Sequence, residues 1–357
     1  MISSKYPTFI IAEAGSNHDG NFKQACQLVD IAVAAGADAV KFQIFKADKL
    51  YTQNCGTIKL NGHKLDLYKF LEASEVNYDW IPKLNKYCNQ KNIIFLATPF
   101  DERSADILAK NKVKAFKIAS SELNHLPLLG HIARKNRPLI MSDGLSTLSD
   151  MEEAINAVLA ENNSRIIVLH CVSSYPAPPE EYNLNFIKTI TEVFGVTAGV
   201  SDHTSDPILI PTLAVCNGAR VIEKHFTISK KLKGADHFFA LEPQELKLMV
   251  KKIREVEKYS EVEKKNYLNK YPKILGSYRK IITPSEKEIY PGDKRSIFSI
   301  KGIKMGEKFS VDNIRILRAE RFLKPGLHPR YWNLLMNKTC QKNILKFRGI
   351  QWENIIK

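Results

Sequence analysis

The fold is decided by the stretch FIIAEAGSNHDGNFKQACQLVDIAVAAGADAVKFQ, residues 9–43. Each end of this stretch is a short apolar run rich in residues that favour strands. Between the two runs, Phe22, Ala25 and Val29 recur with the spacing of one helical face. Gly36 then ends the helix, as glycine does at many helix C-termini. A strand, a helix and a strand in this order predict two neighbouring parallel strands.

Eight runs of this strand-forming kind occur in the first 230 residues, and amphipathic stretches separate them. The runs are Phe9–Glu13, Ala39–Gln43, Ile93–Thr98, Ala115–Ala119, Leu139–Ser142, Ile166–His170, Val196–Ser201 and Val221–His225. One helical face spans Met151–Leu159, with Ser149 and Glu152 in capping-box positions, and another spans Leu246–Val256. Eight strand-helix units fit the roughly 250 residues of a closed barrel. The sequence therefore predicts an α/β fold, a (β/α)8 TIM barrel, with an open doubly wound sheet as the alternative.

The chain divides into three parts, of which residues 1–258 form the predicted barrel. In residues 259–288 the helical pattern gives way to Lys, Tyr, Pro and Gly, which predicts a linker. Residues 289–357 predict a small domain with short strands at Ile297–Ile300 and Ile314–Leu317. A unit of about 70 residues buries little apolar surface alone, so we expect it to pack on the barrel or on a neighbouring subunit.

The composition is that of a folded globular protein. Of the 357 residues, 44% are hydrophobic and 25% are charged, which excludes disordered and collagen-like classes. Neither the amino terminus nor any later stretch has the run of about 18 apolar residues that a membrane span needs, so the predicted location is the cytoplasm. The six cysteines are scattered without a CxxC pair, which predicts reduced thiols.

The net charge of +15 lies entirely in the last third of the chain. Residues 1–250 carry 27 Lys and Arg against 27 Asp and Glu, whereas residues 251–357 carry 26 against 11. Such a surface attracts nucleic acid, a membrane or an anionic metabolite. A solvated Lys-rich surface is the favoured interpretation, because the lysines are dispersed and no nucleic-acid motif accompanies them. We therefore predict neither a nucleic-acid nor a membrane partner.

Polar side chains gather at the carboxyl ends of the predicted strands, where the loops of a barrel carry its chemistry. They are Glu13, Lys41, Gln43, Thr98, Lys117, Ser120, Glu122, Ser142, Ser173, Tyr175, Ser201, Asp202, His203, Glu223, Lys224 and His225. A single Lys or Glu at a strand end is usually a salt-bridge partner. Burying so many charges without a ligand would cost several kcal/mol each, so together they predict a binding site.

His203 and His225 end neighbouring strands, so their rings can converge on one ion. Two neutral imidazoles without a cysteine cluster favour a divalent metal with open positions, such as Mn²⁺, over a closed structural zinc site. Hydrogen-bonded core histidines are the alternative. Lys41 and Lys117 are two positive charges that suit a phosphate and a carboxylate, with hydroxyl donors beside them. The ring therefore predicts a phosphorylated acid and a carbonyl compound as ligands.

Several motifs of this ring resemble the sialic acid synthase family, which comprises the synthases of N-acetylneuraminate, legionaminate and pseudaminate. The motifs are IAEAGSNHDG (11–20), VKFQ (40–43), TPFD (98–101), FKIASSE (116–122), HCVSSYPAP (170–178), SDHT (201–204) and EKHFT (223–227). They follow the family's order and spacing to the end of the barrel. In the tail, RSIFSIKGIKMGEKFSVDNI (295–314) and PGLHP (325–329) resemble the family's antifreeze-like (SAF) domain.

The resemblance implies an enzyme that condenses phosphoenolpyruvate with the open-chain aldehyde of an N-acylated hexosamine. The sugar would be N-acetylmannosamine or a 2,4-diacetamido hexose, and the products a nine-carbon 2-keto acid and phosphate. The implied contacts with phosphoenolpyruvate are Lys41, Thr98, Lys117, Ser120, Ser142, Ser173, Ser201 and His203. The implied contacts with the sugar are Gln43, Tyr175 and Asp236.

The resemblance also implies a metal ion held by His203 and His225, which polarises the aldehyde and makes His225 a catalytic residue. The predicted ion is Mn²⁺, with Mg²⁺ or Co²⁺ as alternatives. Formation of the carbon-carbon bond leaves a cationic centre that water attacks. A carboxylate must handle the proton of that water, and Glu13 and Glu122 are the candidates.

The sequence departs from the family's pattern at two places. Ser173 stands where the neuraminate-making members have Asn, although other branches carry Ser. In the family's SAF domain an Arg just before Pro-Gly reaches across a domain-exchanging homodimer to the sugar. Here ILRAERFLKPG (316–326) spreads this region out, and we favour Arg318 for that role over Arg321 and Lys324. Separately, the long excursion Lys46–Asn92 between the second and third strands is expected to hang over the mouth of the barrel.

Two rival functions stay open. The first is a related phosphoenolpyruvate aldol synthase acting on a sugar phosphate, which would need a further basic cluster. The second is a non-catalytic carbohydrate-binding or polyanion-binding protein that uses the basic tail. Within the favoured function, the residues around Asp236 and the PGLHP motif favour a diacetamido sugar over N-acetylmannosamine.

Overall fold

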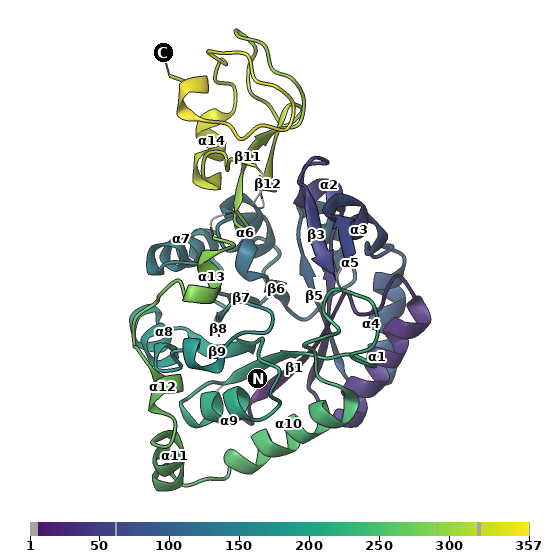
Figure 1. Ribbon diagram of the computed structural model, residues 1–357, viewed down its shortest axis with the longest axis vertical. Helices are drawn as coiled ribbons and strands as arrows, with labels where there is room; N and C mark the ends of the chain where they lie inside the picture. The colour runs from purple at the N-terminus through teal and green to yellow at the C-terminus, as the bar shows by residue number, and fades with distance from the viewer. Residues whose placement is uncertain (1–5, 61–62, 291, 320–322, 357) are drawn as a thin grey trace.

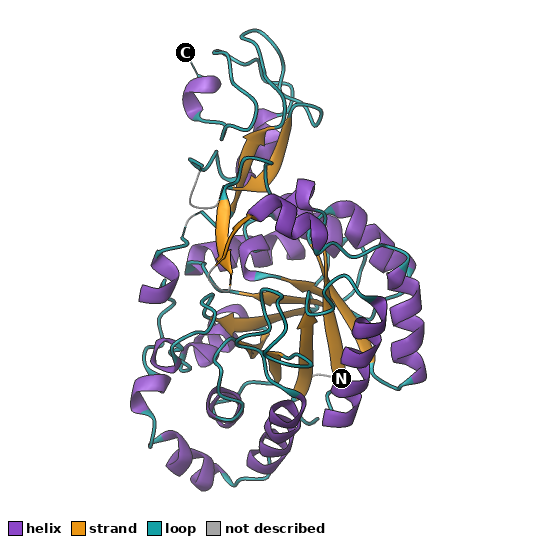
Figure 2. Ribbon diagram, turned by 45° about the vertical axis from the view of Figure 1, so that its right-hand side comes forward, coloured by secondary structure: helices purple, strands orange, loops and turns teal. Residues whose placement is uncertain are grey.

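The computed structural model describes residues 6–60, 63–290, 292–319 and 323–356. Eight parallel strands close into one barrel in the order β1-β10-β9-β8-β7-β6-β5-β2 (Figures 1 and 2). The strands are β1 (Phe9–Gly15), β2 (Ala39–Ile44), β5 (Ile94–Pro99), β6 (Phe116–Ile118), β7 (Leu139–Ser142), β8 (Ile166–Cys171), β9 (Thr197–Asp202) and β10 (Val221–His225). Because β1 pairs with both β10 and β2, the predicted TIM barrel is confirmed and the open-sheet alternative is wrong.

Helices surround the barrel and cover the outer faces of its strands (Figure 2). They are α1 (Phe22–Ala35), α4 (Trp80–Gln90), α5 (Glu102–Lys110), α6 (Leu126–Ala133), α7 (Leu148–Leu159), α8 (Phe186–Phe194), α9 (Leu209–Cys216) and α10 (Pro243–Val256). Gly36 ends α1 as predicted, with a φ of 81° that favours glycine. The capping box of α7 is Thr147 with Asp150, so the predicted Ser149 and Glu152 were wrong by two residues. None of the helices in the described part of the chain is long and apolar enough to cross a bilayer.

The excursion between β2 and β5 forms a small layer at the mouth of the barrel (Figure 1). It contains α2 (Ala47–Leu50), the hairpin β3 (Thr57–Leu60) with β4 (His63–Asp66), and α3 (Leu67–Ala73). The side chains of Phe45, Leu50, Tyr51 and Leu67 pack together beneath the hairpin with Phe100 of the next strand loop. The mouth therefore has an apolar wall on this side.

The segment predicted as a linker is folded against the barrel. It forms three short helices, α11 (Glu261–Leu268), α12 (Pro272–Leu275) and α13 (Pro284–Lys287). The backbone N–H groups of Leu184 and Asn185 donate to the carbonyls of Ile274 and Leu275. Residues 259–288 are thus anchored along the barrel beside α8, and they contain helices where the sequence pattern indicated none; their role as a linker stays a prediction.

The small domain stands on the end of the barrel where the strands finish (Figure 1). Its strands β11 (Arg295–Ser299) and β12 (Ile314–Arg318) pair antiparallel, and α14 (Trp332–Leu335) packs beside them. Short 3₁₀ helices occur at Ser120–Glu122, Pro179–Glu181, Pro329–Tyr331 and Trp352–Asn354. The domain has its own core, formed by side chains that include Ile297, Phe309, Ile316, Leu335 and Ile350.

Candidate active site

The centre of the barrel holds a row of alternating charges. The Nζ atom of Lys41 lies 2.8 Å from Oε2 of Glu13 and 3.5 Å from Oε2 of Glu223. The Nζ atom of Lys117 lies 3.5 Å from Oε1 of Glu223. All four side chains are buried. The structure therefore brings the two predicted lysines to opposite sides of one carboxylate.

The two carboxylates of this row differ in their affinity for protons. Burial raises the pKa of Glu13, although the neighbouring ammonium of Lys41 opposes the shift. Burial acts on Glu223 in the same direction, but Lys117 and Lys41 outweigh it and lower the pKa of Glu223. Gln43 Nε2 donates to Glu13 Oε1 at 3.1 Å. Glu13 is thus the carboxylate of the row that takes up a proton more readily.

Three of the predicted hydroxyl groups join the same row. The hydroxyl of Ser142 accepts from Lys117 Nζ at 2.7 Å, and that of Thr98 accepts from Lys41 Nζ at 3.3 Å. The hydroxyl of Ser201 donates to Oε1 of the glutamate between the lysines at 2.9 Å. The lysines therefore have neutral oxygen partners, which an anionic ligand can replace or join.

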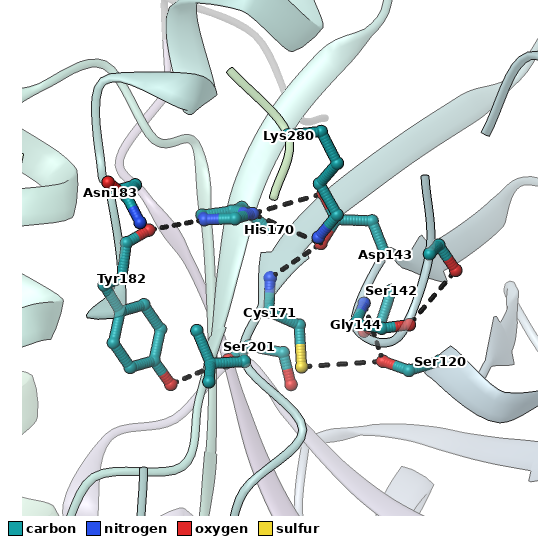
Figure 3. Close-up of polar contacts among 12 residues, drawn as sticks. Ser120, Ser142, Asp143, Gly144, His170, Cys171, Tyr182, Asn183, Ser201 and Lys280 are labelled. Atoms are coloured by element: carbon teal, nitrogen blue, oxygen red, sulfur yellow. Dashed lines mark hydrogen bonds and ion pairs between the residues drawn. The ribbon is translucent and has the colours of Figure 1, made fainter. Parts of the chain in front are cut away.

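Two further serines face each other across a glycine after β7. The backbone N–H of Gly144 points to Ser120 Oγ at 3.1 Å (Figure 3). A Cβ atom on Gly144 would lie 2.2 Å from Ser173 Oγ and 2.8 Å from Ser120 Oγ, so any side chain there would displace the two serine hydroxyls. Within the described residues, the buried hydroxyl of Ser173 has no hydrogen-bond partner. An unpaired buried hydroxyl beside two small groups is suited to binding an oxyanion.

His203 and His225 lie together, with ring centroids 5.5 Å apart, and Tyr175 stacks on His203 at 4.3 Å. Nδ1 of His203 faces the carbonyl of Val172 at 2.8 Å, which leaves Nε2 for a ligand. Burial lowers the pKa of both histidines, so both rings are neutral. Nδ1 of His225 is buried without a hydrogen-bond partner in the described part of the chain, and it lies 3.6 Å from Oδ2 of Asp236.

These donors fit an ion that keeps most of its coordination positions open. Neutral imidazoles are common metal ligands, and one of the two rings has an unsatisfied nitrogen. Among the described residues, no group of three His, Cys, Asp or Glu side chains forms a closed metal cluster. Burial raises the pKa of Asp236 to about 6, with Glu13 adding to the shift. The two imidazoles would thus serve as ligands and would leave the other positions to substrate oxygens or water.

The pairing of β9 with β10 explains why the two histidines meet. β9 ends in Ser201 and Asp202 with His203 directly after it, β10 ends in EKH (223–225), and the register pairs the first two positions of SDH and EKH. The ammonium of Lys224 donates to Oδ2 of Asp202 and to two oxygens of Thr204. Because side chains alternate along a strand, Asp202 and Lys224 face away from the barrel interior, which Ser201 and Glu223 face. In the sequence, the two polar tripeptides SDH and EKH at the ends of consecutive predicted strands indicated that the histidines would meet.

A pocket of about 250 Å³ opens beside His225. Its polar lining includes Gln43, Tyr175, His225, Asp236 and Arg318. One side is apolar and comes largely from the excursion, with Phe45, Leu50, Leu67, Phe70, Leu71 and Phe100. The first part of Lys46–Asn92, up to Ser74, therefore reaches the mouth as expected, whereas α4 packs on the outside of the barrel. The structure thus brings the predicted sugar contacts into one cavity.

Glu122 does not line this pocket and holds two arginines of the small domain instead. Its Oε2 accepts from Arg295 Nε at 2.7 Å and its Oε1 from Arg318 Nη2 at 2.6 Å. Burial disfavours its charge, but Arg295 and Arg318 outweigh that effect and lower the pKa of Glu122. Because both oxygens are paired and the group stays ionised, the structure argues against the predicted role in proton transfer and leaves Glu13.

Arg318 lines the pocket of its own chain, and its predicted reach across a dimer stays a prediction. Its Nη1 lies 3.2 Å from Oδ1 of Asp293 and 3.4 Å from the hydroxyl of Tyr51. Of the alternatives, Lys324 is exposed and is not among the lining residues. Arg321 lies outside the described residues.

Sequence inspection missed several buried charges around the site. Asp143 follows Ser142 directly, and its carboxylate binds Lys280 and His170 (Figure 3). Glu286 and Arg295 come from residues far along the chain and are fully buried against the strand loops. Glu286 binds Leu145 and Ser173, and Arg295 binds Glu122, all more than 100 residues away, so local patterns carried no signal for these contacts.

A (β/α)8 barrel with buried lysines, hydroxyls and two neutral histidines at its strand ends belongs to an enzyme that binds a small anionic substrate. Comparison with known families agrees. Residues 28–265 match the NeuB family, and residues 294–356 match the SAF domain. The chain belongs to the NeuB family. It is a phosphoenolpyruvate-dependent condensing enzyme of the nonulosonate synthase type, and enzymes of this family generally use a divalent metal.

Individual relatives support this assignment over nearly the whole chain. The spore coat polysaccharide biosynthesis protein SpsE of Bacillus subtilis is 46% identical, over 98% of this chain and 94% of that protein. A crystal structure of SpsE from the same organism aligns with a TM-score of 0.86 and 44% identity, covering 100% of this chain and 97% of the other. The N,N'-diacetyllegionaminic acid synthase of Campylobacter jejuni is 36% identical, over 94% of this chain and 96% of that enzyme.

Proposed function

We propose that this enzyme condenses phosphoenolpyruvate with the open-chain aldehyde of a 2,4-diacetamido hexose, giving a nine-carbon 2-keto acid and phosphate. The observation that carries the proposal is the two-ended site. One end is the buried row of Lys41, Lys117 and their carboxylates, and the other is the half-apolar pocket. The histidines lie between a donor end suited to anions and an acceptor end suited to a sugar.

The donor end suits phosphoenolpyruvate because that molecule carries a carboxylate and a phosphate. Lys41 and Lys117 would each neutralise one anionic group. The hydroxyls of Thr98, Ser120, Ser142, Ser173 and Ser201 would donate to its oxygens. The unpaired hydroxyl of Ser173 supports this assignment, because a bound oxyanion would satisfy it.

His203 and His225 would hold the divalent metal, which we propose to be Mn²⁺, with Mg²⁺ and Co²⁺ as the alternatives to test. When bound there, the ion would supply Lewis-acid polarisation of the sugar aldehyde. Glu13 would accept the proton of the water that adds to the former enol carbon, since its raised pKa suits that role. Gln43, which donates to Glu13, would keep the carboxylate oriented.

The pocket supports an uncharged diacetamido sugar in preference to a sugar phosphate. Of the described residues that line it, Arg318 is the only lysine or arginine, and carboxylates already occupy its guanidinium. A second phosphate would lack a free cation. The apolar wall suits the methyl groups of two acetamido substituents, in agreement with the product named for the Campylobacter jejuni relative. Gln43, Tyr175, Asp236 and Arg318 would bind its polar groups.

A substrate panel tests the proposal. The full-length protein is mixed with phosphoenolpyruvate, Mn²⁺ and one sugar, and phosphate release is followed together with the mass of the product. We expect turnover with 2,4-diacetamido hexoses, less with N-acetylmannosamine and none with arabinose 5-phosphate. Turnover with the sugar phosphate alone would favour the aldol synthase, and no turnover with any sugar would favour a non-catalytic binder.

The homodimer stays a prediction. Within one chain, Arg318 already lines the pocket. Light scattering after size-exclusion chromatography would measure the mass of the particle. If the protein is a dimer, mixing an Arg318→Ala chain with a His225→Ala chain tests for exchange. Recovery of activity in the mixture requires that the arginine of one chain completes the site of the other.

A further inference from the structure

The segment 259–288 contributes two buried charged side chains to the loops at the donor end of the site. The side chain of Lys280 is 1% exposed and that of Glu286 is fully buried. Other charges of the same segment face solvent, such as Glu261 at 89% exposure. A buried charge must be held by close partners, so the partners of these two residues reveal their role.

Glu286 holds the loops that follow β7 and β8. Its Oε1 accepts from the backbone N–H of Leu145 at 2.8 Å and from that of Ser173 at 2.9 Å. Its Oε2 accepts from the N–H and the hydroxyl of Thr283, which fixes the carboxylate at the start of α13. Leu145 has a φ of 54°, a left-handed conformation that costs energy for a leucine and needs outside support.

Lys280 supports the same two loops from the other side. Its ammonium lies 2.8 Å from Oδ1 of Asp143, and that oxygen also accepts from the backbone N–H of Cys171 at 2.9 Å (Figure 3). Nδ1 of His170 faces the same carboxylate at 3.2 Å. One buried carboxylate therefore ties the end of β7 to the end of β8, and Lys280 neutralises it.

The contacts of Glu286 and Lys280 lie on either side of the place where Gly144 and Ser173 approach each other. A Cβ atom added to Gly144 would lie only 2.2 Å from Ser173 Oγ, so a side chain there would displace the hydroxyl. The backbone of Ser173 is held by Glu286, and the residue after Gly144 is held by the same oxygen. A shift of either loop would move the serine hydroxyl relative to Gly144 and Ser120.

We propose that Glu286 is a positioning residue for the oxyanion-binding end of the donor site, acting through Ser173 and the Gly144 loop, with Lys280 as its second support. The segment between the barrel and the small domain is then a part of the donor site. This inference rests on the proposed function, because it takes phosphoenolpyruvate as the ligand of that end.

The test compares full-length Glu286→Ala and Glu286→Gln with the exposed control Glu261→Gln. Affinity for phosphoenolpyruvate is measured by calorimetry, and KM is measured separately for phosphoenolpyruvate and for the sugar. Since a charged hydrogen bond to each loop is lost, we expect E286A to bind phosphoenolpyruvate about 10- to 100-fold more weakly. Glutamine keeps one acceptor oxygen, so E286Q should show a smaller loss. The KM for the sugar should change less than twofold, and E261Q should match the wild type.

A double-mutant cycle with Ser173→Ala separates positioning from general support of the fold. If Glu286 acts through Ser173, the loss of affinity in E286Q with S173A is smaller than the product of the two single losses. If the loss of affinity in the double variant equals the product of the two single losses, the inference is wrong. It is also wrong if the KM values for phosphoenolpyruvate and for the sugar rise equally. E286Q keeps the test decisive if E286A does not fold. Wild-type protein that fails to bind phosphoenolpyruvate would refute the proposed function itself, whereas binding that is unchanged in E286Q and E286A refutes only this inference.

Discussion

Nε of Arg295 lies 2.7 Å from Oε2 of Glu122, and this buried contact joins the small domain to the barrel. The other oxygen of Glu122 binds Arg318, whose guanidinium lines the pocket. Arg295 also donates to the backbone carbonyls of Lys49, Phe100 and Ile316. One carboxylate thus seats the domain and orients a pocket residue at the same time.

Replacing Glu122 with Gln should therefore destabilise the protein strongly. The buried guanidinium of Arg295 loses its carboxylate partner, whereas Arg318 keeps Asp293, and breaking a buried pair costs about 3–5 kcal/mol. The control is Glu161→Gln, which removes a 2.6 Å contact with Arg134, a side chain that is 56% exposed. Exposed pairs contribute at most about 1 kcal/mol. Urea unfolding measures both, and equal losses in the two variants would contradict the seating role of Glu122.

Glu13 is expected to affect the rate where Glu122 affects stability. In Glu13→Gln the amide cannot accept a proton, and the loss of a general base lowers rates by about 100- to 10,000-fold. Lys41 keeps Glu223 as a partner, so affinity for phosphoenolpyruvate should fall much less than kcat. Steady-state phosphate release measures both parameters. Glu13→Asp should recover part of the rate, and E13Q with more than a tenth of wild-type kcat would rule out the assigned role.

Local patterns predicted the barrel well and its supports poorly. Each barrel strand begins and ends within two residues of its predicted run, because buried parallel strands are continuous apolar runs. The hairpin β3–β4 was missed, since it lies outside the barrel and lacks such a run. The capping box at Thr147 was missed because two overlapping patterns fit the sequence and only hydrogen bonding distinguishes them.

The candidate site was predictable where chemistry follows strand ends and unpredictable where it depends on distant pairing. Lys117, His203 and His225 lie at or next to the ends of β6, β9 and β10, and Lys41 lies three residues before the end of β2, so the barrel rule brought them together. By contrast, Glu122 looked like a strand-end carboxylate free for proton transfer. Only the fold reveals that arginines more than 170 residues away occupy both of its oxygens.

The raised pKa of Asp236, about 6, predicts a pH-dependent contribution to stability in the metal-free protein. The folded state binds a proton more tightly than the unfolded state, so this contribution is full below pH 4 and is lost as pH rises through about 6. The side chain is 21% exposed, so we expect a change of about 1–3 kcal/mol between pH 4 and 7. Asp236→Asn should remove it, and Asp48→Asn, at a 52% exposed side chain, should not. If the free energy of unfolding depends on pH in the same way for wild type and D236N, the prediction is wrong.

His225→Ala should abolish metal binding while leaving the barrel folded. One of the two protein ligands is lost, and since removal of an outer-shell partner alone weakens metal binding by about 10- to 100-fold, we expect a loss of at least about 100-fold. Calorimetry with Mn²⁺ on the metal-free protein measures the affinity directly, without relying on turnover. The matched control is His131→Ala on α6, whose ring faces Asp106 away from the site. If H225A keeps wild-type affinity for Mn²⁺, or if metal-stripped wild type retains full activity, the two histidines do not hold a catalytic metal.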